Sequence, residues 1–346
     1  MRTLTFSTLL TLCLMLSACD SGSSTSSSKS NATTQSSSGA SGDKKLTVAL
    51  LPKKKGVPYF TTCAQGAEEA AKELGINLIY DGPTDGAAEK QANMIEKWTL
   101  QGVDVIAVSP NDPNVLAPAM KKARDKGLHV ITWDADGMPG TREFFVNQAT
   151  AQDIGYAMVD TMAKDLGGDP AGDVAIITAS LTAANQNAWM EHMKERLKKY
   201  PKLNLVTVKP SEEDQKLAFQ VAQDLMKAYP NLKGIFAISS NAFPGAAEAI
   251  KQAGRSGQVL VTGLSTPNDM KAYVKDGTVK SVILWNTIDL GYLTLQSANS
   301  LAKGTLKTGA SSVNAGRLGE HKIDGDNVLL GKILIFTKDN IDQFNF

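Results

Sequence analysis

The sequence predicts an α/β fold made of two doubly wound, parallel-sheet lobes. Three observations lead to this fold class. Short apolar runs alternate with amphipathic stretches from Leu46 onward, and the alternation restarts after Gln148. About 300 residues take part in it, which is enough for two hydrophobic cores. Strands and helices that alternate in this way form right-handed βαβ units around parallel sheets.

The expected strands are short runs rich in Val and Ile, typical of strands that are buried on both faces. In the first half they span residues 46–51, 76–80, 103–108 and 129–133, with helices over residues 64–74, 88–100 and 113–126. In the second half the helices span residues 151–166, 184–199, 213–228 and 244–253, with strands over residues 174–179, 203–208, 234–239 and 259–264. So many strands are not expected in one sheet, so we predict two lobes.

The N-terminus has the features of a lipoprotein signal peptide over residues 1–18. Arg2 is followed by an apolar run from Leu4 to Leu16, which is too short for a permanent membrane-spanning helix. Small residues then precede Cys19, as in a lipobox. Acylation of the Cys19 thiol and of its freed amine would supply the two signals that stable anchoring requires. The alternative is a plain signal peptide followed by a chance cysteine.

Residues 19–45 are expected to form a flexible tether behind the lipidated Cys19. From Asp20 to Asp43 the chain is almost entirely Ser, Thr, Gly, Ala, Asn and Gln. Such a segment has no large apolar side chain to offset the entropy of ordering. A coil of this length reaches roughly 25 to 30 Å, which suits docking of the folded part onto a membrane partner.

Charge and cysteine content exclude several classes of protein. The net charge is +1, so no basic surface for nucleic acid is expected. Of the three cysteines, Cys13 leaves with the signal peptide and Cys19 carries lipid, which leaves Cys63 alone. An internal disulfide is therefore not expected, and the small residues around Cys63 favour a buried structural thiol.

Polar residues follow the predicted strands in both halves of the chain. In open parallel sheets, ligands bind beyond the carboxyl ends of the strands. These positions hold Pro52-Lys53, Tyr59-Phe60, Ser109 to Asp112, Trp133 to Asp136, Ser180 to Asn187, Ser239 to Pro244, and Ser265 to Asn268. Acids and amides grip the hydroxyls of sugars, and flat aromatic rings stack on their apolar faces. The strand ends therefore predict a cleft that binds a small sugar-like molecule.

Individual residues at these strand ends also have structural interpretations. An Asn or Asp after a strand often caps the next helix, so capping and binding stay open for each of them. Tyr59 and Phe60 fit a hydrophobic core as well as a site. Trp189 lies one turn into its predicted helix, which favours packing over ligand contact.

The charged residues of the first half differ in their setting. Lys53 directly follows a strand and Pro52, whereas Lys54 and Lys55 fit a solvated loop. For Asp134 we expect no serine or threonine partner that would compete with a ligand. Lys53 and Asp134 are therefore the charged candidates.

Other function classes lack their signatures. An enzyme needs a nucleophile with a base, or a metal cluster. His129, His192 and His321 lie far apart and without a metal-ligand spacing, and no phosphate-binding glycine motif follows the first strand. A transcription regulator with the same core would carry a helix-turn-helix in place of the lipobox and tether. We therefore expect no catalysis, no metal and no cofactor.

Several segments spread over both halves carry a resemblance to known proteins. They are Tyr80 to Thr84, Ile131 to Asp134, Asn185 to Asn187 with Trp189, Asn241 to Ala247, Leu264 to Asn268, Gly277 to Lys280 with Leu284-Trp285, and Phe336 to Asp342. Through them, Leu46 to Phe346 resembles the periplasmic sugar-binding family of ABC importers, and most of all its autoinducer-2 and rhamnose branches. The resemblance implies the type I periplasmic binding protein fold, with two lobes joined by three crossovers that close on ligand like a hinged clamp. The lobes would comprise residues 46–148 with 283–320, and residues 149–282 with 321–346.

The resemblance also implies ligand-binding positions. The autoinducer-2 pattern is matched by Lys53, Asp134 and Gln186, and by main-chain contacts at Pro244 and Ala246. That pattern has aspartate where this chain has Asn185, and the Asn-Gln-Asn run is more similar to rhamnose binders. The ligand stays open between autoinducer-2, a cyclic tetrahydroxy furanose derivative, and a deoxyhexose such as rhamnose. The expected ligand-binding residues are Lys53, Tyr59, Phe60, Asp134, Asp136, Asn185, Gln186, Asn241, Pro244, Ala246, Ser265 and Trp285.

The function that the resemblance implies is that of an extracytoplasmic solute-binding lipoprotein. It would capture its sugar-like ligand and hand it to an ABC permease with its ATPase. A monomer is expected, with no nucleic-acid partner. The alternative is a chemoreceptor-coupled sensor of a sugar or of the quorum-sensing signal autoinducer-2, and the sequence leaves both open.

Overall fold

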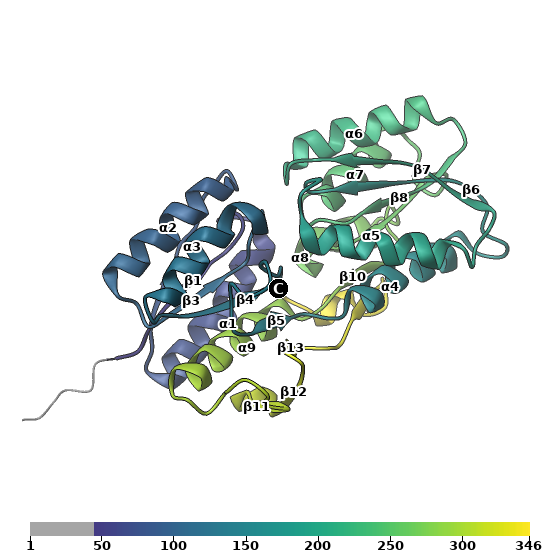
Figure 1. Cartoon of the computed structure of the whole chain (residues 1–346). Coiled ribbons are helices and arrows are strands. Elements are labelled where there is room, and N and C mark those ends of the chain that lie inside the picture. The colour runs from purple at the N-terminus through teal and green to yellow at the C-terminus, as the bar shows by residue number, and fades with distance from the viewer. Residues whose placement is uncertain (1–44) are drawn as a thin grey trace, which may run out of the picture. The chain divides into compact units, whose positions relative to one another are not determined.

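The computed structural model describes residues 45–346. The expected signal peptide, the lipid attachment at Cys19 and the tether up to residue 44 lie outside the described residues. Within the described part, no helix is both long enough and apolar enough to cross a membrane. The described residues form the predicted α/β fold with two lobes, each built around its own sheet (Figure 1).

The first lobe contains an eight-stranded sheet in the order β11-β12-β13-β5-β4-β3-β1-β2. Its strands are β1 (Thr47–Leu51), β2 (Asn77–Tyr80), β3 (Val105–Val108), β4 (His129–Trp133), β5 (Phe145–Asn147), β11 (Ser312–Asn314), β12 (Glu320–Asp324) and β13 (Asn327–Leu329). The pairs from β13 through to β2 are parallel, and β11 and β12 add antiparallel pairs at one edge. Every residue of β3 is buried, because helices cover both faces of the parallel part.

The helices of the first lobe form two pairs. They are α1 (Pro58–Leu74), α2 (Ala88–Gln101), α3 (Pro113–Asp125) and α9 (Thr287–Ala302). In one pair α2 packs on α3, and in the other α1 packs on α9, which comes from far along the chain. A Cβ on Gly66 would lie 1.8 Å from the Ile288 carbonyl oxygen, and one on Gly291 would lie 1.7 Å from that of Cys63. Glycine therefore lets these two backbones touch. Cys63 of α1 is a buried free thiol, as predicted.

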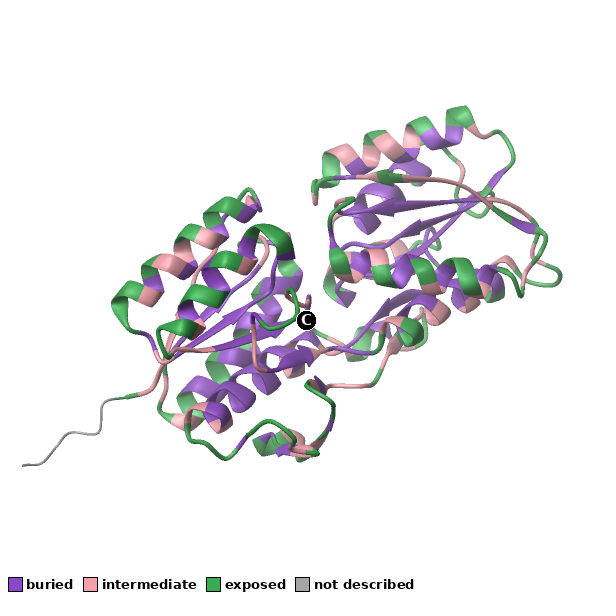
Figure 2. Ribbon diagram, viewed as in Figure 1, coloured by how far each residue is buried: buried purple, intermediate pink, exposed green. Residues whose placement is uncertain are grey.

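The second lobe contains a four-stranded parallel sheet in the order β7-β6-β8-β9. Its strands are β6 (Gly172–Thr178), β7 (Leu203–Pro210), β8 (Leu232–Ala237) and β9 (Leu260–Gly263). Its helices are α4 (Ala151–Leu166), α5 (Ala184–Leu197), α6 (Gln215–Ala228), α7 (Ala242–Gln252) and α8 (Pro267–Lys275). Buried residues line the sheet-facing sides of these helices (Figure 2).

Short elements mark where the chain passes between the lobes. A separate two-stranded sheet pairs β10 (Val282–Leu284) with β14 (Leu334–Phe336), and the 3-10 helices η1 (Gly316–Leu318) and η2 (Ile341–Gln343) complete the chain. The chain enters the second lobe after β5, returns after β10 and crosses again after β13. The expected lobe boundary between residues 320 and 321 falls inside β12, which pairs in the larger sheet. We infer that this last crossing lies between Leu329 and Leu334.

Candidate functional site

The carboxyl ends of β1, β3 and β4 place three polar side chains together. In the parallel register β3 lies between β1 and β4, so the residues that follow these strands emerge side by side. The Lys53 ammonium lies 3.6 Å from Asp134 Oδ2, and the Ser109 hydroxyl donates to the same oxygen at 2.8 Å. This edge of the sheet therefore holds a carboxylate between a cation and a hydroxyl donor.

The Asp134 carboxylate is buried and is held by donors on both oxygens. The Tyr59 hydroxyl donates to Oδ1 at 2.8 Å, while Ser109 occupies one site on Oδ2. The expectation that no serine competes for Asp134 was wrong, because Ser109 is a neighbour only across the sheet. A carboxylate has about four lone-pair sites, so these bonds fix its orientation and leave it able to accept from ligand hydroxyls.

The backbone of Asp134 has an uncommon conformation. Its φ is 62°, in the left-handed region that few residues other than glycine adopt. The Asp134 amide donates to the Val146 carbonyl at 3.2 Å, and the Gln148 Nε2 donates to the Asp134 carbonyl at 3.0 Å. These bonds to the β5 segment hold the strained turn that aims the carboxylate.

Tyr59 connects Asp134 to an indole. The Trp285 Nε1 donates to the Tyr59 hydroxyl at 3.0 Å, and the hydroxyl donates onward to Asp134. Burial, and next the negative charge of Asp134, raise the pKa of Tyr59 well above its usual range. The hydroxyl therefore stays neutral and keeps its proton on the bond to the carboxylate.

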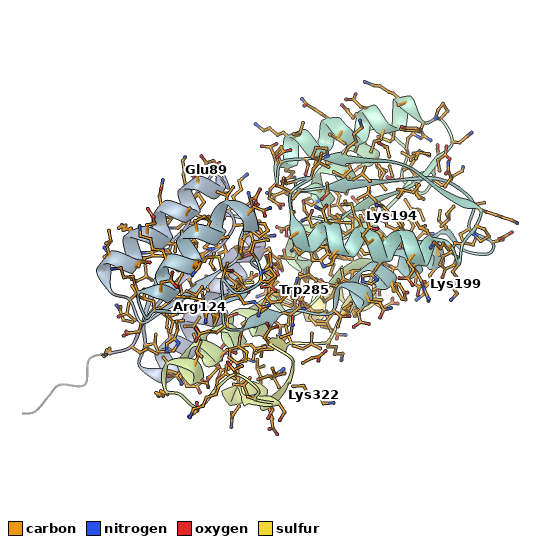
Figure 3. All side chains as sticks on the ribbon, viewed as in Figure 1. Glu89, Arg124, Lys194, Lys199, Trp285 and Lys322 are labelled. Atoms are coloured by element: carbon orange, nitrogen blue, oxygen red, sulfur yellow. The ribbon has the colours of Figure 1, made fainter. Side chains whose placement is uncertain are left out.

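Aromatic rings from both lobes meet in this region. Tyr59 contacts Phe60 and Trp285 edge to face, and Trp285 contacts Trp189 with ring centroids 6.2 Å apart. Figure 3 shows Trp285 where side chains of the two lobes come together. For Trp189 packing was favoured over ligand contact, and its ring both packs here and lines the cavity described below.

The second lobe contributes Asn185 and Gln186 from the first turn of α5. The Gln186 Oε1 accepts from the Thr178 hydroxyl and from the Ala179 amide, which fixes the side chain across the end of β6. Asn185 Oδ1 accepts from the Gln186 amide at 2.9 Å. The helix start thus presents two oriented amide groups.

Hydrogen bonds join residues of the first lobe directly to residues of the second, and these two sets of residues form the two walls of the site. The Lys53 Nζ donates to Asn185 Oδ1 at 3.0 Å, and Asn185 Nδ2 lies 3.4 Å from the Asp134 carbonyl that it donates to. The Lys54 Nζ donates at 3.0 Å to the carbonyl of Glu213 in the second lobe. Lys54 was expected in a solvated loop with Lys55, but only Lys55 fits that description, pairing with Asp81 at the surface.

These residues surround a cavity of about 190 Å³. That size suits a small ligand, since pockets for drug-sized molecules measure roughly 300 to 1,000 Å³. The lining residues are Lys53, Lys54, Tyr59, Phe60, Asp85, Gly86, Ala87, Asn111, Asp134, Ala179, Ser180, Ala183, Asn185, Gln186, Trp189, Glu212, Glu213, Ile238, Ser239, Ser240, Leu264, Leu284 and Trp285. The lining combines charged, amide and aromatic groups, which is the chemistry that holds a polyol.

The structure places the expected site residues in two groups. Those that line the cavity are Lys53, Tyr59, Phe60, Asp134, Asn185, Gln186 and Trp285. Those that lie off its lining are Asp136, Asn241, Pro244, Ala246 and Ser265.

The residues off the lining have partners of their own. Asp136 is bound by Arg142, whose Nη2 lies 2.6 Å from Oδ2. Ser265 donates to the Ser240 carbonyl, and Asn241 donates to the Glu213 carbonyl. Pro244 and Ala246 are buried within α7, which begins beside the cavity residues Ser239 and Ser240.

Several cavity residues were not among the expected ligand-binding residues, although Asn111 belongs to the polar strand end Ser109 to Asp112. Asp85 and Asn111 lie in loops that follow the ends of β2 and β3, and Glu212 and Glu213 follow β7. Only their position after a strand could have signalled them, and the predicted helix over residues 213–228 includes Glu213. Glu213 is half-buried at the cavity, and desolvation there raises the pKa of its carboxyl.

Within residues 45–346, no group of His, Cys, Asp and Glu side chains is arranged to hold a metal ion. Burial raises the pKa of the Cys63 thiol well above its usual range. Cys63 therefore stays a thiol rather than a thiolate. The chemistry of the cavity is hydrogen bonding and aromatic contact.

Comparison with known proteins gives a consistent family. A family model described as "Periplasmic binding protein domain" matches residues 48–306. The D-allose-binding periplasmic protein of Escherichia coli is 26% identical over 70% of this chain and 80% of its own length. The ribose import binding protein RbsB of Salmonella typhimurium is 28% identical over 75% of this chain and 86% of its own length.

Solved structures agree in fold and in coverage. LsrB from Clostridium saccharobutylicum in complex with AI-2 has a TM-score of 0.83 and 28% identity, covering 87% of this chain and 100% of that one. A solute-binding protein from Clostridium phytofermentas with bound L-rhamnose has a TM-score of 0.82 and 32% identity, covering 87% of this chain and 98% of that one. The resemblance predicted from the sequence is confirmed at the level of the family.

Proposed function

We propose that this chain, which belongs to the periplasmic binding protein family, captures a small neutral sugar between its two lobes. Its relatives are solute-binding proteins and not enzymes. The single observation that carries this proposal is the Asp134 carboxylate. It lies in a small cavity, oriented by Tyr59 and Ser109 and neutralised in part by Lys53.

The cavity chemistry fits a polyol better than other small solutes. A fixed carboxylate and fixed amides accept from and donate to hydroxyls, and the rings of Phe60, Trp189 and Trp285 offer apolar faces. The charged lining residues include Asp85, Asp134, Glu212 and Glu213 against Lys53 and Lys54. This excess of acids disfavours phosphorylated or carboxylated sugars.

We propose an L-rhamnose-like deoxyhexose or autoinducer-2 as the ligand. The AI-2-bound and L-rhamnose-bound structures support this choice by their coverage and their TM-scores of 0.83 and 0.82. Asn185 separates the two candidates. It differs from the aspartate of the autoinducer-2 pattern, and its Nδ2 donates to the Asp134 carbonyl. The ribose- and allose-binding relatives make D-ribose and D-allose the alternatives to include.

We further propose that the protein is a lipid-anchored component of an ABC importer. Lipidation at Cys19 would hold it at the outer face of the cytoplasmic membrane, and the tether would let the lobes reach a permease and its ATPase. Closure of the lobes on the sugar would present the loaded form, which we expect to be a monomer. The support is the signal-peptide pattern together with relatives that are import binding proteins.

Calorimetric titration of the mature protein tests the ligand. L-rhamnose, autoinducer-2, D-ribose and D-allose are each titrated, with D-ribose 5-phosphate as the anionic control. We expect at least one neutral sugar to bind and to raise the melting temperature by mass action. If none of the neutral sugars binds, or if the phosphorylated sugar binds tightest, the proposed function is wrong.

A further inference from the structure

The turn between β7 and α6 holds two strained residues at the cavity. Glu212 and Glu213 have φ values of 51° and 49°, in the left-handed region, and neither is a glycine. L-residues adopt this conformation rarely, and two in succession persist only where surrounding contacts hold them. Both residues line the cavity.

Contacts from both lobes hold the backbone of Glu213. The Asn241 Nδ2 donates to the Glu213 carbonyl at 2.9 Å, and the Lys54 Nζ donates to the same oxygen at 3.0 Å. Asn241 was expected to contact ligand itself, but its side chain instead supports this turn. The strained conformation is therefore held from the second lobe and, across the cavity, from the first.

The Glu213 side chain is directed by the same support. Its Oε1 accepts a hydrogen bond from the backbone N–H of Asn241 at 3.2 Å. The carboxyl also forms a hydrogen bond with Ser239, another lining residue. The charges of Lys53 and Lys54 act on the Glu213 carboxyl, but the ammonium groups contact other oxygens, Lys53 that of Asp134 and Lys54 the backbone carbonyl of Glu213. In the described part of the chain the Glu213 carboxyl therefore borders the cavity without a salt bridge of its own.

We propose that Glu213 is a specificity-determining ligand contact, whose carboxyl accepts a hydrogen bond from a hydroxyl of the bound sugar. It acts from the second lobe as Asp134 acts from the first. A carboxylate has about four lone-pair sites, and its protein donors leave capacity for a ligand. The proposal rests on the proposed function of sugar binding. It narrows the ligand class to polyols with hydroxyl donors for two separate acids.

Glu213→Gln is the test variant, because the amide keeps an oxygen for Asn241 and changes the other atom from acceptor to donor. Asp214→Asn is the matched control. It removes one negative charge from the next residue, which caps α6 through the Leu217 amide and lies off the cavity lining. Asparagine caps helices about as well as aspartate. Both variants are titrated with L-mannose and its 6-deoxy form L-rhamnose, and with D-ribose and 2-deoxy-D-ribose.

We expect Glu213→Gln to weaken the tightest of these sugars about tenfold or more, and Asp214→Asn to change affinity less than about twofold. Each deoxy sugar lacks one hydroxyl of its parent sugar. If that hydroxyl is the one that donates to Glu213, the loss of affinity from the deoxy sugar and the loss from Glu213→Gln should not be additive. A ligand-free melting curve checks folding. If Glu213→Gln lowers that temperature markedly, Glu213→Asp is titrated instead and is expected to weaken the same sugar.

Two outcomes are distinguishable. If wild-type protein binds a sugar and the folded Glu213 variants bind it equally well, Glu213 only shapes the turn and the inference is overturned. If wild-type protein binds none of the sugars, the proposed function fails and takes the inference with it.

Discussion

The Lys53 ammonium donates a 3.0 Å hydrogen bond to the Asn185 side-chain oxygen, across 132 positions of sequence. Lys53 follows β1 of the first lobe, and Asn185 lies in the first turn of α5 in the second. The same ammonium lies 3.6 Å from Asp134. One cation therefore connects the acid of one wall with the amide of the other.

Lys53→Met should weaken binding of the cognate sugar about tenfold or more. The change removes a charged hydrogen bond across the cavity and leaves Asp134 without its cation. Lys55→Met is the control, because Lys55 lies in the same loop but pairs with Asp81 at the surface. Calorimetry compares the two, and equal affinities would show that the cross-lobe bond does not contribute to binding.

Asp134→Asn should reduce affinity by about 1.5 to 3 kcal/mol, the range for hydrogen bonds to charged groups. Asp136→Asn is the matched control. It makes the same chemical change two residues away, where the carboxylate binds Arg142 and lies off the cavity lining. We expect that control to bind sugar normally and to melt at a lower temperature. An Asp134 variant with unchanged affinity would assign this residue to the fold alone.

Asn185→Asp should shift preference from L-rhamnose toward autoinducer-2. The aspartate keeps the acceptor for Lys53 but loses the donor to the Asp134 carbonyl, so it offers ligand hydroxyls only acceptors. An unpaired buried polar group costs about 1 to 3 kcal/mol, so the ratio of the two dissociation constants should change fivefold or more. Titration of both ligands into both proteins measures the ratio, and a constant ratio contradicts a role in specificity.

Glu213→Gln should stabilise the ligand-free protein at neutral pH, in opposition to its expected effect on affinity. Burial raises the folded-state pKa of Glu213 above its ordinary value of 4.5. A carboxyl whose pKa is raised in the folded state stabilises the fold while it is protonated. This contribution to the free energy of unfolding is complete below pH 4.5 and is lost as pH rises through the folded-state pKa. The glutamine amide does not ionise, so the variant does not lose this stability as pH rises. Its melting temperature should therefore exceed that of wild type by a margin that grows from pH 4 to pH 8.

Glu191→Gln is the control for that pH series, and it should change the melting temperature at neutral pH in the opposite direction. Lys194 lowers the pKa of the exposed Glu191 carboxyl through a hydrogen bond. The contribution of Glu191 to stability is therefore present above its ordinary pKa, and the amide should lose it, to a small extent, at neutral pH. A flat difference for Glu213→Gln between pH 4 and pH 8 would show that its carboxyl is not desolvated in the folded protein.

Cys19→Ser should abolish lipid labelling and release the protein from membranes. The small residues before Cys19 predict lipidation there. Incorporation of labelled palmitate and membrane fractionation are measured together. A mutant that still takes up palmitate and still fractionates with membranes contradicts the predicted anchor.

The local pattern of the chain predicted most of its long elements but not its three-residue strands. Residues 129–133 were predicted as a strand and residues 151–166 as a helix, and both have those bounds in the structure. The three-residue strands β10 and β14 were not predicted, because they are too short for a periodic pattern and depend on each other for pairing. The helix α9 was missed because it is buried almost all round and has no clear polar stripe.

By itself, the sequence determined the fold class and the strand ends at which cavity-lining residues lie. Apolar periodicity and the polar residues that follow each strand are local properties, and they indicated Lys53 and Asp134. The family resemblance singled out Asn185 and Gln186, and all four residues line the cavity. Whether a polar residue enters the cavity was decided by the tertiary structure. Asp136 forms a salt bridge with Arg142, and Asp134 accepts a hydrogen bond from Ser109, which follows an adjacent strand.

The Glu213 turn shows the physical reason for this division. Its left-handed backbone is closed locally by one hydrogen bond, from the Asp214 amide to the Ser211 carbonyl at 2.8 Å, and two non-glycine residues need more support than that. Asn241, 28 residues away, and Lys54, 159 residues away, supply the hydrogen bonds that hold it. Contacts of that kind exist only after the lobes have formed, so a cavity residue that depends on them has no signature in the sequence around it.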